Sequence, residues 1–407
     1  MNIGAMLELE AARQRLLDAI QPLPAETVSL SDAAGRILAE AVVSPLDLPP
    51  FDNSAMDGYA VRSADVASAS PQSPTLLKLA GHVPAGAVFT GTVQPGTCVR
   101  VFTGSPMPAG ADAMVMQEDT RLETNQPERV LVLDRAKPWE NVRFRGEDIK
   151  AAGVLAQAGE IITVGRMGLI AAAGISTASV HRRPVVGLIA TGSELVEAGQ
   201  PLPPGKIYES NRRALEPLLA RCGAVTRAFP LVPDTLDATR RALKQALDEC
   251  DAVVTSGGVS VGELDFVKTA FEQLGGTMDF WRVAIKPGKP FVFGRLGGKF
   301  LFGLPGNPVS ALVTFLLLVR PALRRWQGAT NVLPPVGHGV LAEALTNQGD
   351  RSHFMRVRVD ENATVHSAGA QASHLLSSLA VADGLVEVPP NASLAAGSPV
   401  RVIRINE

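Results

Sequence analysis

The spacing of apolar residues changes character several times along the chain. Residues 5–20 carry apolar side chains at helical intervals, and residues 29–41 predict a second helix that begins after a serine. Residues 45–150 instead contain short strand-like apolar runs between glycine and proline turns. Residues 160–180 return to helical spacing. The first and third stretches are therefore expected to pack together around a β-rich insert.

Beyond residue 181, strands alternate with helices of ten residues or more, which is typical of a doubly wound, largely parallel α/β sheet. Short strands return after residue 337 and predict a small C-terminal β domain. The fold class is therefore multidomain α/β plus β. The expected domains are a composite N-terminal helical domain (1–45 and 150–180), a β-rich insert (46–149), an α/β domain (181–327) and a C-terminal β domain (328–407).

Composition narrows the class of protein. Of 407 residues, 46% are hydrophobic and 19% are charged, which permits large cores and excludes general disorder. The formal net charge of −2 argues against non-specific binding to nucleic acid or to an anionic membrane. Three widely spaced cysteines indicate neither a disulfide framework nor a thiolate zinc site. With no signal-peptide pattern and no apolar stretch long enough to span a bilayer, we expect a cytoplasmic protein.

Three glycine-containing loops follow predicted strands of the α/β domain: TGSE (191–194), SGGVSVGE (256–263) and GLPGNP (303–308). Ligands of open α/β sheets bind at the carboxyl ends of the strands, where free backbone N–H groups can hold anions. A single such loop is explained equally well by turn formation and helix capping, but three at one edge predict a phosphate or nucleotide pocket. Neither a Walker A motif nor a Rossmann fingerprint is present, which argues against an ATP-driven motor and an NAD enzyme.

Charged residues gather in two further places. Arg282, Lys286 and Lys289 suit an anionic ligand, and Arg282 and Lys286 would share one face if residues 282–286 form a strand. The alternative is a solvated strand edge. Within the insert, FDNSAMDGYA (51–60) and NVRFRGED (141–148) concentrate acids that could serve a Mg²⁺ site beside a phosphate pocket. The alternative here is turn chemistry with surface ion pairs.

These motifs resemble the MoeA family of molybdopterin molybdenumtransferases, to which the C-terminal domain of gephyrin also belongs. The matching runs extend from residue 49 to about residue 315 and include PPFDNSAMDGYAVR, NVRFRGEDI, TGSEL, SGGVSVGELDFVK, FWRVAIKPGKPFVFG and GLPGNPVSALVTF. The resemblance implies an elongated homodimer whose active site lies between the α/β domain of one subunit and the insert of the other. It also implies the last step of molybdenum cofactor biosynthesis: molybdate enters adenylylated molybdopterin, and AMP is released with Mg²⁺.

The resemblance also suggests roles for individual residues. Glu194 and Asp265 are implied to hold Mg²⁺, while Asp57 and Asp148 are implied to act from the partner's insert. The implied catalytic residues are thus Asp57, Asp148, Glu194, Asp265 and Lys286. The implied ligand-binding residues are Thr103, Arg143, Ser256, Gly257, Gly258, Arg282, Lys289, Pro305, Gly306, Asn307, Pro308, Arg356 and Ser373. The chain departs from the family at Ser193 and Glu209, where Asp is frequent, and at Arg282, where Lys is frequent.

Two other functions remain as alternatives. The related molybdopterin adenylyltransferase consists of the α/β module alone, so the insert and the C-terminal domain argue against it. A non-catalytic scaffold or binding protein could use the same fold, but the complete set of acids favours an enzyme. The adenylyltransferase and the recipient molybdoenzymes are further partners that the resemblance suggests.

Overall fold

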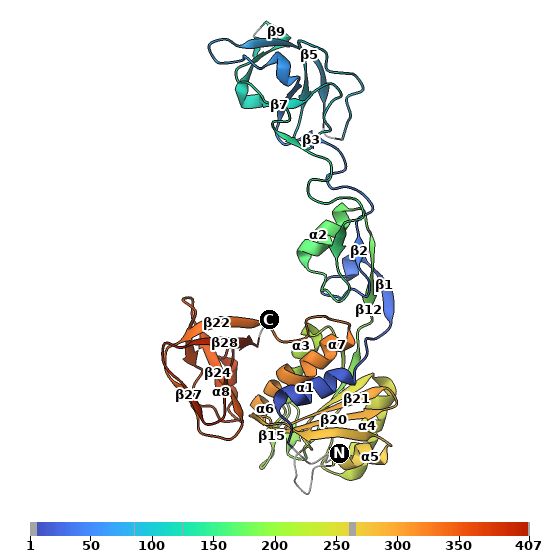
Figure 1. Cartoon of the computed structure of the whole chain (residues 1–407). Coiled ribbons are helices and arrows are strands. Elements are labelled where there is room, and N and C mark those ends of the chain that lie inside the picture. The colour runs from blue at the N-terminus through green and yellow to red at the C-terminus, as the bar shows by residue number, and fades with distance from the viewer. Residues whose placement is uncertain (1–5, 85, 124, 260–265, 406–407) are drawn as a thin grey trace.

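The computed structural model describes residues 6–84, 86–123, 125–259 and 266–405. The chain is elongated: the insert occupies one end, a small middle part follows, and the α/β and C-terminal domains lie side by side at the other end (Figure 1). Within the described residues, no helix is both long enough and apolar enough to cross a membrane.

The α/β domain is built on one six-stranded sheet. The strand order is β16-β13-β17-β21-β20-β18; the first four strands are parallel, and β20 and β18 continue the sheet antiparallel. The expected largely parallel α/β sheet is therefore confirmed. The bounds are β13 Val185–Ala190, β16 Val225–Ala228, β17 Ala252–Ser256, β18 Thr277–Arg282, β20 Pro290–Leu296 and β21 Lys299–Leu304. A separate short pair joins β14 Leu195–Val196 to β15 Ile207–Tyr208.

Helices cover both faces of this sheet. One core cluster unites α3, α6 and α7 with the sheet, and a second cluster unites α4 and α5 with the other face. The helices are α3 Asn211–Arg221, α4 Leu236–Glu249, α5 Val267–Gln273, α6 Pro308–Thr314 and α7 Arg320–Trp326, with the π-helical turn η4 Phe315–Val319 between the last two.

The N-terminal helix α1, Leu9–Asp18, belongs to this domain and not to the composite piece in which we expected it. Its buried residues Leu9, Ala12 and Leu16 lie on one helical face and join the core that contains α7 and η4. The Leu7 N–H donates to the Arg282 carbonyl, and the Ala284 N–H donates to the Leu7 carbonyl, which anchors the start of the described chain to the edge of the sheet.

The middle part contains less helix than the sequence predicts. It consists of β1 Ala25–Ser29 with β12 Thr177–His181, β2 Val42–Val43 with β11 Val154–Ala156, and the helix α2 Val164–Ala172. The predicted helix over 29–41 is wrong: only a 3-10 turn, η1 Leu30–Asp32, forms there. Gly35 has a φ of 72°, which ends the turn, and Ile37 and Leu38 then pair in extended form with Ile161 and Val180.

The insert is an all-β unit, as its short strand-like apolar runs predict. Its sheet has the order β7-β4-β6-β5-β9-β8 and contains two apolar clusters. The strands are β4 Gly58–Val61, β5 Thr75–Val83, β6 Thr97–Val101, β7 Ala113–Met116, β8 Thr120–Glu123 and β9 Gln126–Val132. The turns are η2 Ser63–Asp65 and η3 Gln117–Asp119, and β3 Asn53–Ser54 pairs with β10 Val142–Arg143 near the neck of the insert.

One short strand of the α/β domain joins the sheet of the C-terminal domain. Its six-stranded sheet has the order β19-β24-β25-β22-β28-β26, and β19, Ile285–Lys286, comes from the α/β domain. The remaining elements are β22 Val336–Leu341, β23 Leu345–Asn347, β24 Ser352–Val359, β25 Thr364–Ser367, α8 Leu376–Ala380, β26 Gly384–Val388, β27 Ala392–Leu394 and β28 Pro399–Arg404. Residues 282–286 therefore do not form one strand: β18 ends at Arg282, the chain bends at Ala284, and Lys286 lies in the other sheet.

The junction between the middle part and the α/β domain is held by one carboxylate. Asp251 accepts hydrogen bonds from Arg182 Nη1 and Nη2 at 2.8 and 2.9 Å, and from the Val185 N–H at 2.7 Å. Burial raises the pKa of Asp251, but these donors outweigh burial and hold that pKa below its ordinary value.

We expect Asp251→Asn to lower the free energy of unfolding by about 1–2 kcal/mol at pH 7, because Arg182 loses its charged acceptor. Urea unfolding followed by far-ultraviolet circular dichroism measures this loss. Asp248→Asn is the matched control, because Asp248 pairs with Lys244 on the exposed face of α4. A loss no larger than that of the control would contradict the anchoring role of Asp251.

Candidate functional site

The carboxyl ends of the parallel strands open onto one hollow of about 300 Å³. Thr191 and Glu194 follow β13, Gly257 and Gly258 follow β17, and Pro305 to Asn307 follow β21. The three glycine loops thus meet as the parallel arrangement requires. The described residues that line it are Thr191, Gly192, Glu194, Asp234, Gly257, Gly258, Val259, Pro290, Pro305, Gly306 and Asn307. Pro308 begins α6 directly behind the third loop.

The second loop lies so close to the first that side chains cannot fit between them. Gly257 has a φ of 90°, and a Cβ there would lie 2.5 Å from the Thr191 carbonyl oxygen. Gly258 has a φ of 68°, and its Cβ would lie 2.8 Å from Thr191 Oγ1. Two consecutive glycines are therefore needed to keep this backbone against the floor of the hollow.

A buried amide that the sequence analysis missed connects the second and third loops. Asn211, the first residue of α3, donates from Nδ2 to Ser256 Oγ at 2.7 Å and to the Gly306 carbonyl at 2.6 Å. Ser256 is itself buried. Its hydroxyl thus takes part in holding the loops together. An Asn at the start of a helix is also a common cap, so sequence alone gives no sign of this second role.

Two acids stand on the wall of this hollow. Glu194 is exposed, and its carboxylate forms no ion pair within the described residues. Asp234, which sequence analysis missed, follows β16, so a fourth strand end contributes to the same hollow. Asp234 accepts from the Ser193 N–H at 2.8 Å, and Ser193 Oγ accepts from the Asp234 N–H at 2.8 Å. Asp265 lies outside the described residues.

The oxygen donors of this hollow fit a magnesium ion that takes some of its ligands from the protein and others from a bound substrate. Among the described residues, no three His, Cys, Asp or Glu side chains form a metal-binding group. Mg²⁺ commonly takes only one or two carboxylates and completes its coordination with water and phosphate oxygens. Glu194 and Asp234 provide such a pair.

A second hollow, of about 620 Å³, adjoins the first at the C-terminal domain. The two share Pro290, Pro305 and Asn307 in their walls. Asn307 Nδ2 donates to Ser373 Oγ at 3.1 Å, and the Val309 N–H donates to the Ser373 carbonyl at 3.2 Å. Ser373 therefore sits where the third glycine loop meets the C-terminal domain.

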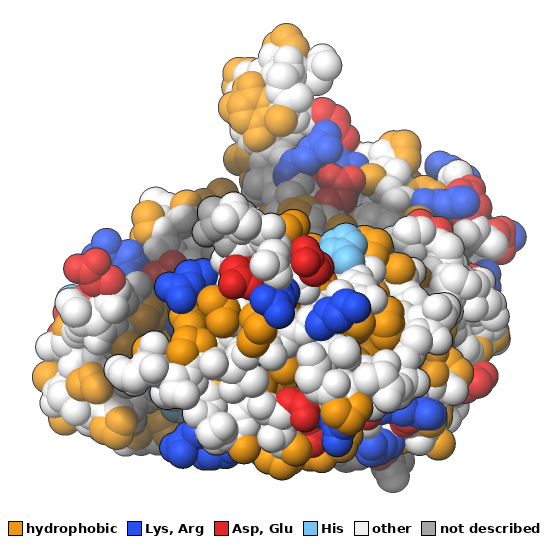
Figure 2. Space-filling view, turned by 90° about the horizontal axis from the view of Figure 1, so that it is seen from above, with side chains coloured by type: hydrophobic (Ala, Val, Ile, Leu, Met, Phe, Trp, Pro, Cys, Tyr) orange, Lys and Arg blue, Asp and Glu red, His pale blue; other side chains and the backbone are white. Residues whose placement is uncertain are grey.

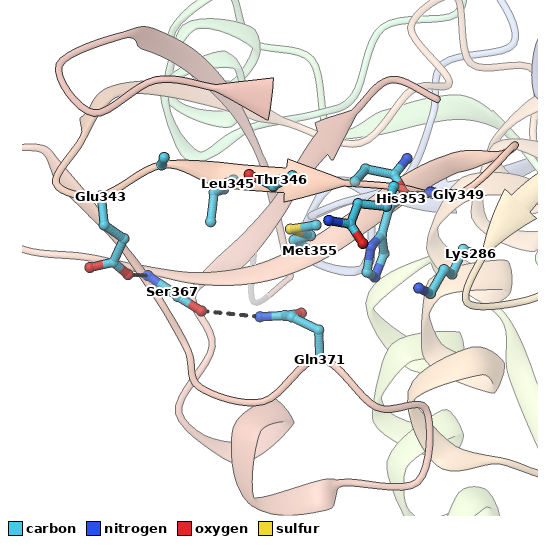
Figure 3. A pocket seen from close by; sticks show the side chains of 12 residues that line it. Lys286, Glu343, Leu345, Thr346, Gly349, His353, Met355, Ser367 and Gln371 are labelled. Atoms are coloured by element: carbon cyan, nitrogen blue, oxygen red, sulfur yellow. Dashed lines mark hydrogen bonds between the residues drawn. The ribbon is translucent and has the colours of Figure 1, made fainter. Parts of the chain in front are cut away.

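This second hollow is lined by three cations: Lys286, Lys289 and Arg351. Sequence analysis missed Arg351, whose Nη1 donates to the Ile285 carbonyl at 2.8 Å across the joint between the domains. A third hollow of about 400 Å³ continues the space and shares Lys286, His353 and Gln371 with the second (Figure 3). Its far wall carries one acid, Glu343, which accepts from the Ser367 N–H at 2.7 Å. We call the three hollows together the interdomain groove.

Arg356 and Arg282, which we expected to contact the ligand, do not line this groove. Arg356 is 1% exposed, and its Nη1 and Nη2 donate to the Ala372 and Ala370 carbonyls at 3.0 and 2.8 Å. Burial and these backbone bonds mean that Arg356 supports the loop before Ser373, and its contact with a ligand stays a prediction. Arg282, in the sheet of the α/β domain, lines none of the three hollows.

The insert lies at the opposite end of the molecule from the α/β domain, so its predicted site residues are separate from the groove (Figure 1). Asp57 Oδ1 accepts from the N–H and from the hydroxyl of Thr103, both at 2.8 Å. These bonds, led by the one from the Thr103 N–H, hold the pKa of Asp57 below its ordinary value. Arg143 pairs with Asn53 through β10 and β3, and both Arg143 and Asp148 are exposed. Within one chain, none of these residues reaches the groove.

Comparisons with known proteins cover nearly the whole chain. The model of the MoeA N-terminal region (domains I and II) matches residues 7–174, that of a probable molybdopterin binding domain matches 187–325, and that of the MoeA C-terminal region (domain IV) matches 338–405. The molybdopterin molybdenumtransferase of Haemophilus influenzae is 39% identical and covers 91% of this chain and 92% of its own. Molybdopterin molybdenumtransferase 2 of Mycobacterium tuberculosis is 40% identical, with coverages of 92% and 94%. The solved molybdopterin biosynthesis MoeA protein of Pyrococcus horikoshii aligns with a TM-score of 0.84 and 32% identity over 98% of this chain and 99% of that one.

One buried histidine in the groove should make the stability of the protein depend on pH. His353 is 4% exposed, and its Nε2 has no hydrogen-bond partner among the described residues. Burial, then the nearby charges of Lys286, Arg356 and Arg351, lower its pKa from 6.5 to about 4. As the pH falls, His353 is protonated in the unfolded chain before it is protonated in the folded chain, and this favours unfolding. The contribution of His353 to stability is therefore complete above pH 6.5 and is lost as the pH falls toward 4.

We expect His353 to lower the free energy of unfolding by about 2 kcal/mol when the pH falls from 7.5 to 5. In His353→Asn, this part of the change between the two pH values should be absent. Urea unfolding at both pH values measures that difference. His338→Asn, on the exposed side of β22 in the same sheet, is the control and should behave as the wild type. A full wild-type difference in His353→Asn would show that His353 does not titrate in this way.

Proposed function

Since this chain belongs to the MoeA family of molybdopterin molybdenumtransferases, we propose that its interdomain groove inserts molybdate into adenylylated molybdopterin and releases AMP. The chain is a transferase of molybdenum cofactor biosynthesis. One observation carries the finer proposal: a glycine-loop hollow suited to phosphates opens directly into a hollow lined by Lys286, Lys289 and Arg351. An anionic ligand and a small oxyanion can thus occupy neighbouring parts of one groove.

The residues of the groove divide the work by their chemistry. Backbone N–H groups of the loops at 257–258 and 305–307 bind phosphate oxygens of the substrate. Lys286, Lys289 and Arg351 attract and orient molybdate, whose charge they offset. Cleavage of a phosphoanhydride builds charge on oxygen atoms, and preorganised donors of this kind stabilise that charge without a covalent nucleophile.

We propose that Glu194 and Asp234 hold Mg²⁺ in this hollow, together with phosphate oxygens of the substrate. When bound, the ion would neutralise charge that develops on the phosphate group. The reciprocal hydrogen bonds between Ser193 and Asp234 keep the Asp234 carboxylate turned toward the loop that carries Glu194.

The insert acids need a second copy of the chain. The insert lies at the far end of the molecule from the α/β domain (Figure 1), so we propose a homodimer in which the insert of one subunit completes the groove of the other. We further propose that this dimer works in the cytoplasm, with an adenylyltransferase that supplies its substrate and molybdoenzymes that receive its product. It needs neither nucleic acid nor a membrane.

A mixed-dimer experiment tests whether the site is shared. Asp57→Asn and Glu194→Gln subunits, each inactive alone, should together form a heterodimer with one intact site and one doubly altered site. We expect up to half of the wild-type rate per heterodimer, measured as molybdate-stimulated AMP release from adenylylated molybdopterin.

The reciprocal mixture is the control. A subunit that carries both substitutions, paired with a wild-type subunit, should be inactive if the site is shared, because each site then contains one altered residue. Recovery in this second mixture and none in the first would place the whole site within one chain.

The cations of the groove should act chiefly on molybdate. We expect Lys286→Met to raise the KM for molybdate about tenfold or more, because a charged donor to an oxyanion is lost. Steady-state rates over a range of molybdate concentrations measure this. Lys244→Met, on the exposed face of α4, is the control. An unchanged KM in Lys286→Met would remove this lysine from the molybdate site.

A further inference from the structure

A guanidinium on the insert is held between two aromatic rings. Arg100, in β6, is the register partner of Tyr59 in β4 and of His82 in β5, so the three side chains share one face of the sheet. Arg100 Cζ lies 4.9 Å from the centroid of the Tyr59 ring and 5.4 Å from that of Phe102. The Phe102 ring in turn meets the His82 ring edge to face at 5.5 Å.

The same guanidinium is fixed at one end and open at the other. Arg100 Nη2 donates to Gln117 Oε1. Within the part of the chain that the structure describes, Arg100 forms no ion pair with a carboxylate, and its side chain is only half-buried. The aromatic rings and one neutral acceptor therefore orient the cation, while its remaining donors are left for another group.

Asp57 lies beside this cluster. It precedes Tyr59 by two residues and accepts two hydrogen bonds from Thr103, the residue that follows Phe102. The positive charge of Arg100 also favours the ionised form of Asp57. Seen from above, the surface of the molecule as a whole carries basic and acidic side chains interspersed with hydrophobic ones (Figure 2).

We propose that Arg100 binds a phosphate group of the adenylylated substrate in the groove of the partner subunit, next to Asp57. This inference rests on the proposed function, in which the insert completes the partner's groove. A carboxylate brought to a substrate with several negative charges repels it, and a neighbouring guanidinium offsets that repulsion. The planar fork of arginine also matches two phosphate oxygens, and a side chain already held by two rings loses little freedom on binding.

Substitution of Arg100 separates this role from a structural one. Arg100→Met keeps an apolar stem against Tyr59 and Phe102 but removes the charge, and we expect it to raise the KM for adenylylated molybdopterin about tenfold or more. The kcat and the KM for molybdate should change far less. Arg100→Lys keeps the charge without the planar fork and should give an intermediate KM.

Arg129→Met is the matched control, because Arg129 lies in the same sheet, half-exposed and paired with Glu123 at 3.4 Å. It should leave both KM values unchanged. Thermal unfolding of each variant shows whether the insert is intact. If Arg100→Met does not fold, Arg100→Lys decides: a raised KM at the wild-type unfolding temperature supports the proposal, and an unchanged KM overturns it.

Mixed dimers separate failure of this inference from failure of the proposed function. Arg100→Met with Glu194→Gln should restore the wild-type KM at the one intact site, as Asp57→Asn with Glu194→Gln restores activity there. A wild-type KM in the folded Arg100→Met homodimer, with complementation between Asp57→Asn and Glu194→Gln retained, would overturn the role of Arg100 alone. Loss of that complementation would instead overturn the shared site.

Discussion

The antiparallel pairing of β1 with β12 determines where the chemical groups of this chain can act. The two strands are joined by five residue pairs, from Ala25 with His181 to Ser29 with Thr177. Together they form the two-stranded connection between the α/β domain and the middle part. The insert lies beyond that connection and at the far end of the molecule (Figure 1). An arm built in this way keeps Asp57 from the glycine loops of its own chain. The proposed dimer with a shared site would bring both sets of residues together.

At the other end of the molecule, a two-residue strand has a comparable effect. Residues 285–286 leave the α/β sheet and pair with β24, which places Lys286 beside His353 at the joint. The bond from Arg351 to the Ile285 carbonyl and that from Asn307 to Ser373 close the same joint from two sides. The groove is thus a property of two domains held together, and neither domain alone contains all of its cations.

Sequence patterns predicted those features that depend on local rules. The glycine loops follow from strand periodicity and from the geometry of parallel sheets, and the structure brings them together. Asn211, Asp234 and Arg351 were missed because their roles depend on contacts between elements far apart in the sequence. The predicted helix at 29–41 failed because extended pairing with residues 161 and 180 outweighs helical spacing there. The burial of the Arg356 guanidinium against backbone carbonyls could not be predicted either, because it too depends on tertiary contacts.

The serine at position 193 holds the loop against Asp234 without adding a negative charge. Ser193 Oγ accepts the Asp234 N–H, which an aspartate carboxylate at this position could also accept. An aspartate would, however, place another negative charge next to Asp234 and Glu194. Close carboxylates repel one another unless a cation lies between them. The serine therefore keeps the loop in place with less charge to neutralise. In the proposed Mg²⁺ site, more of the binding of the ion would then depend on substrate phosphates.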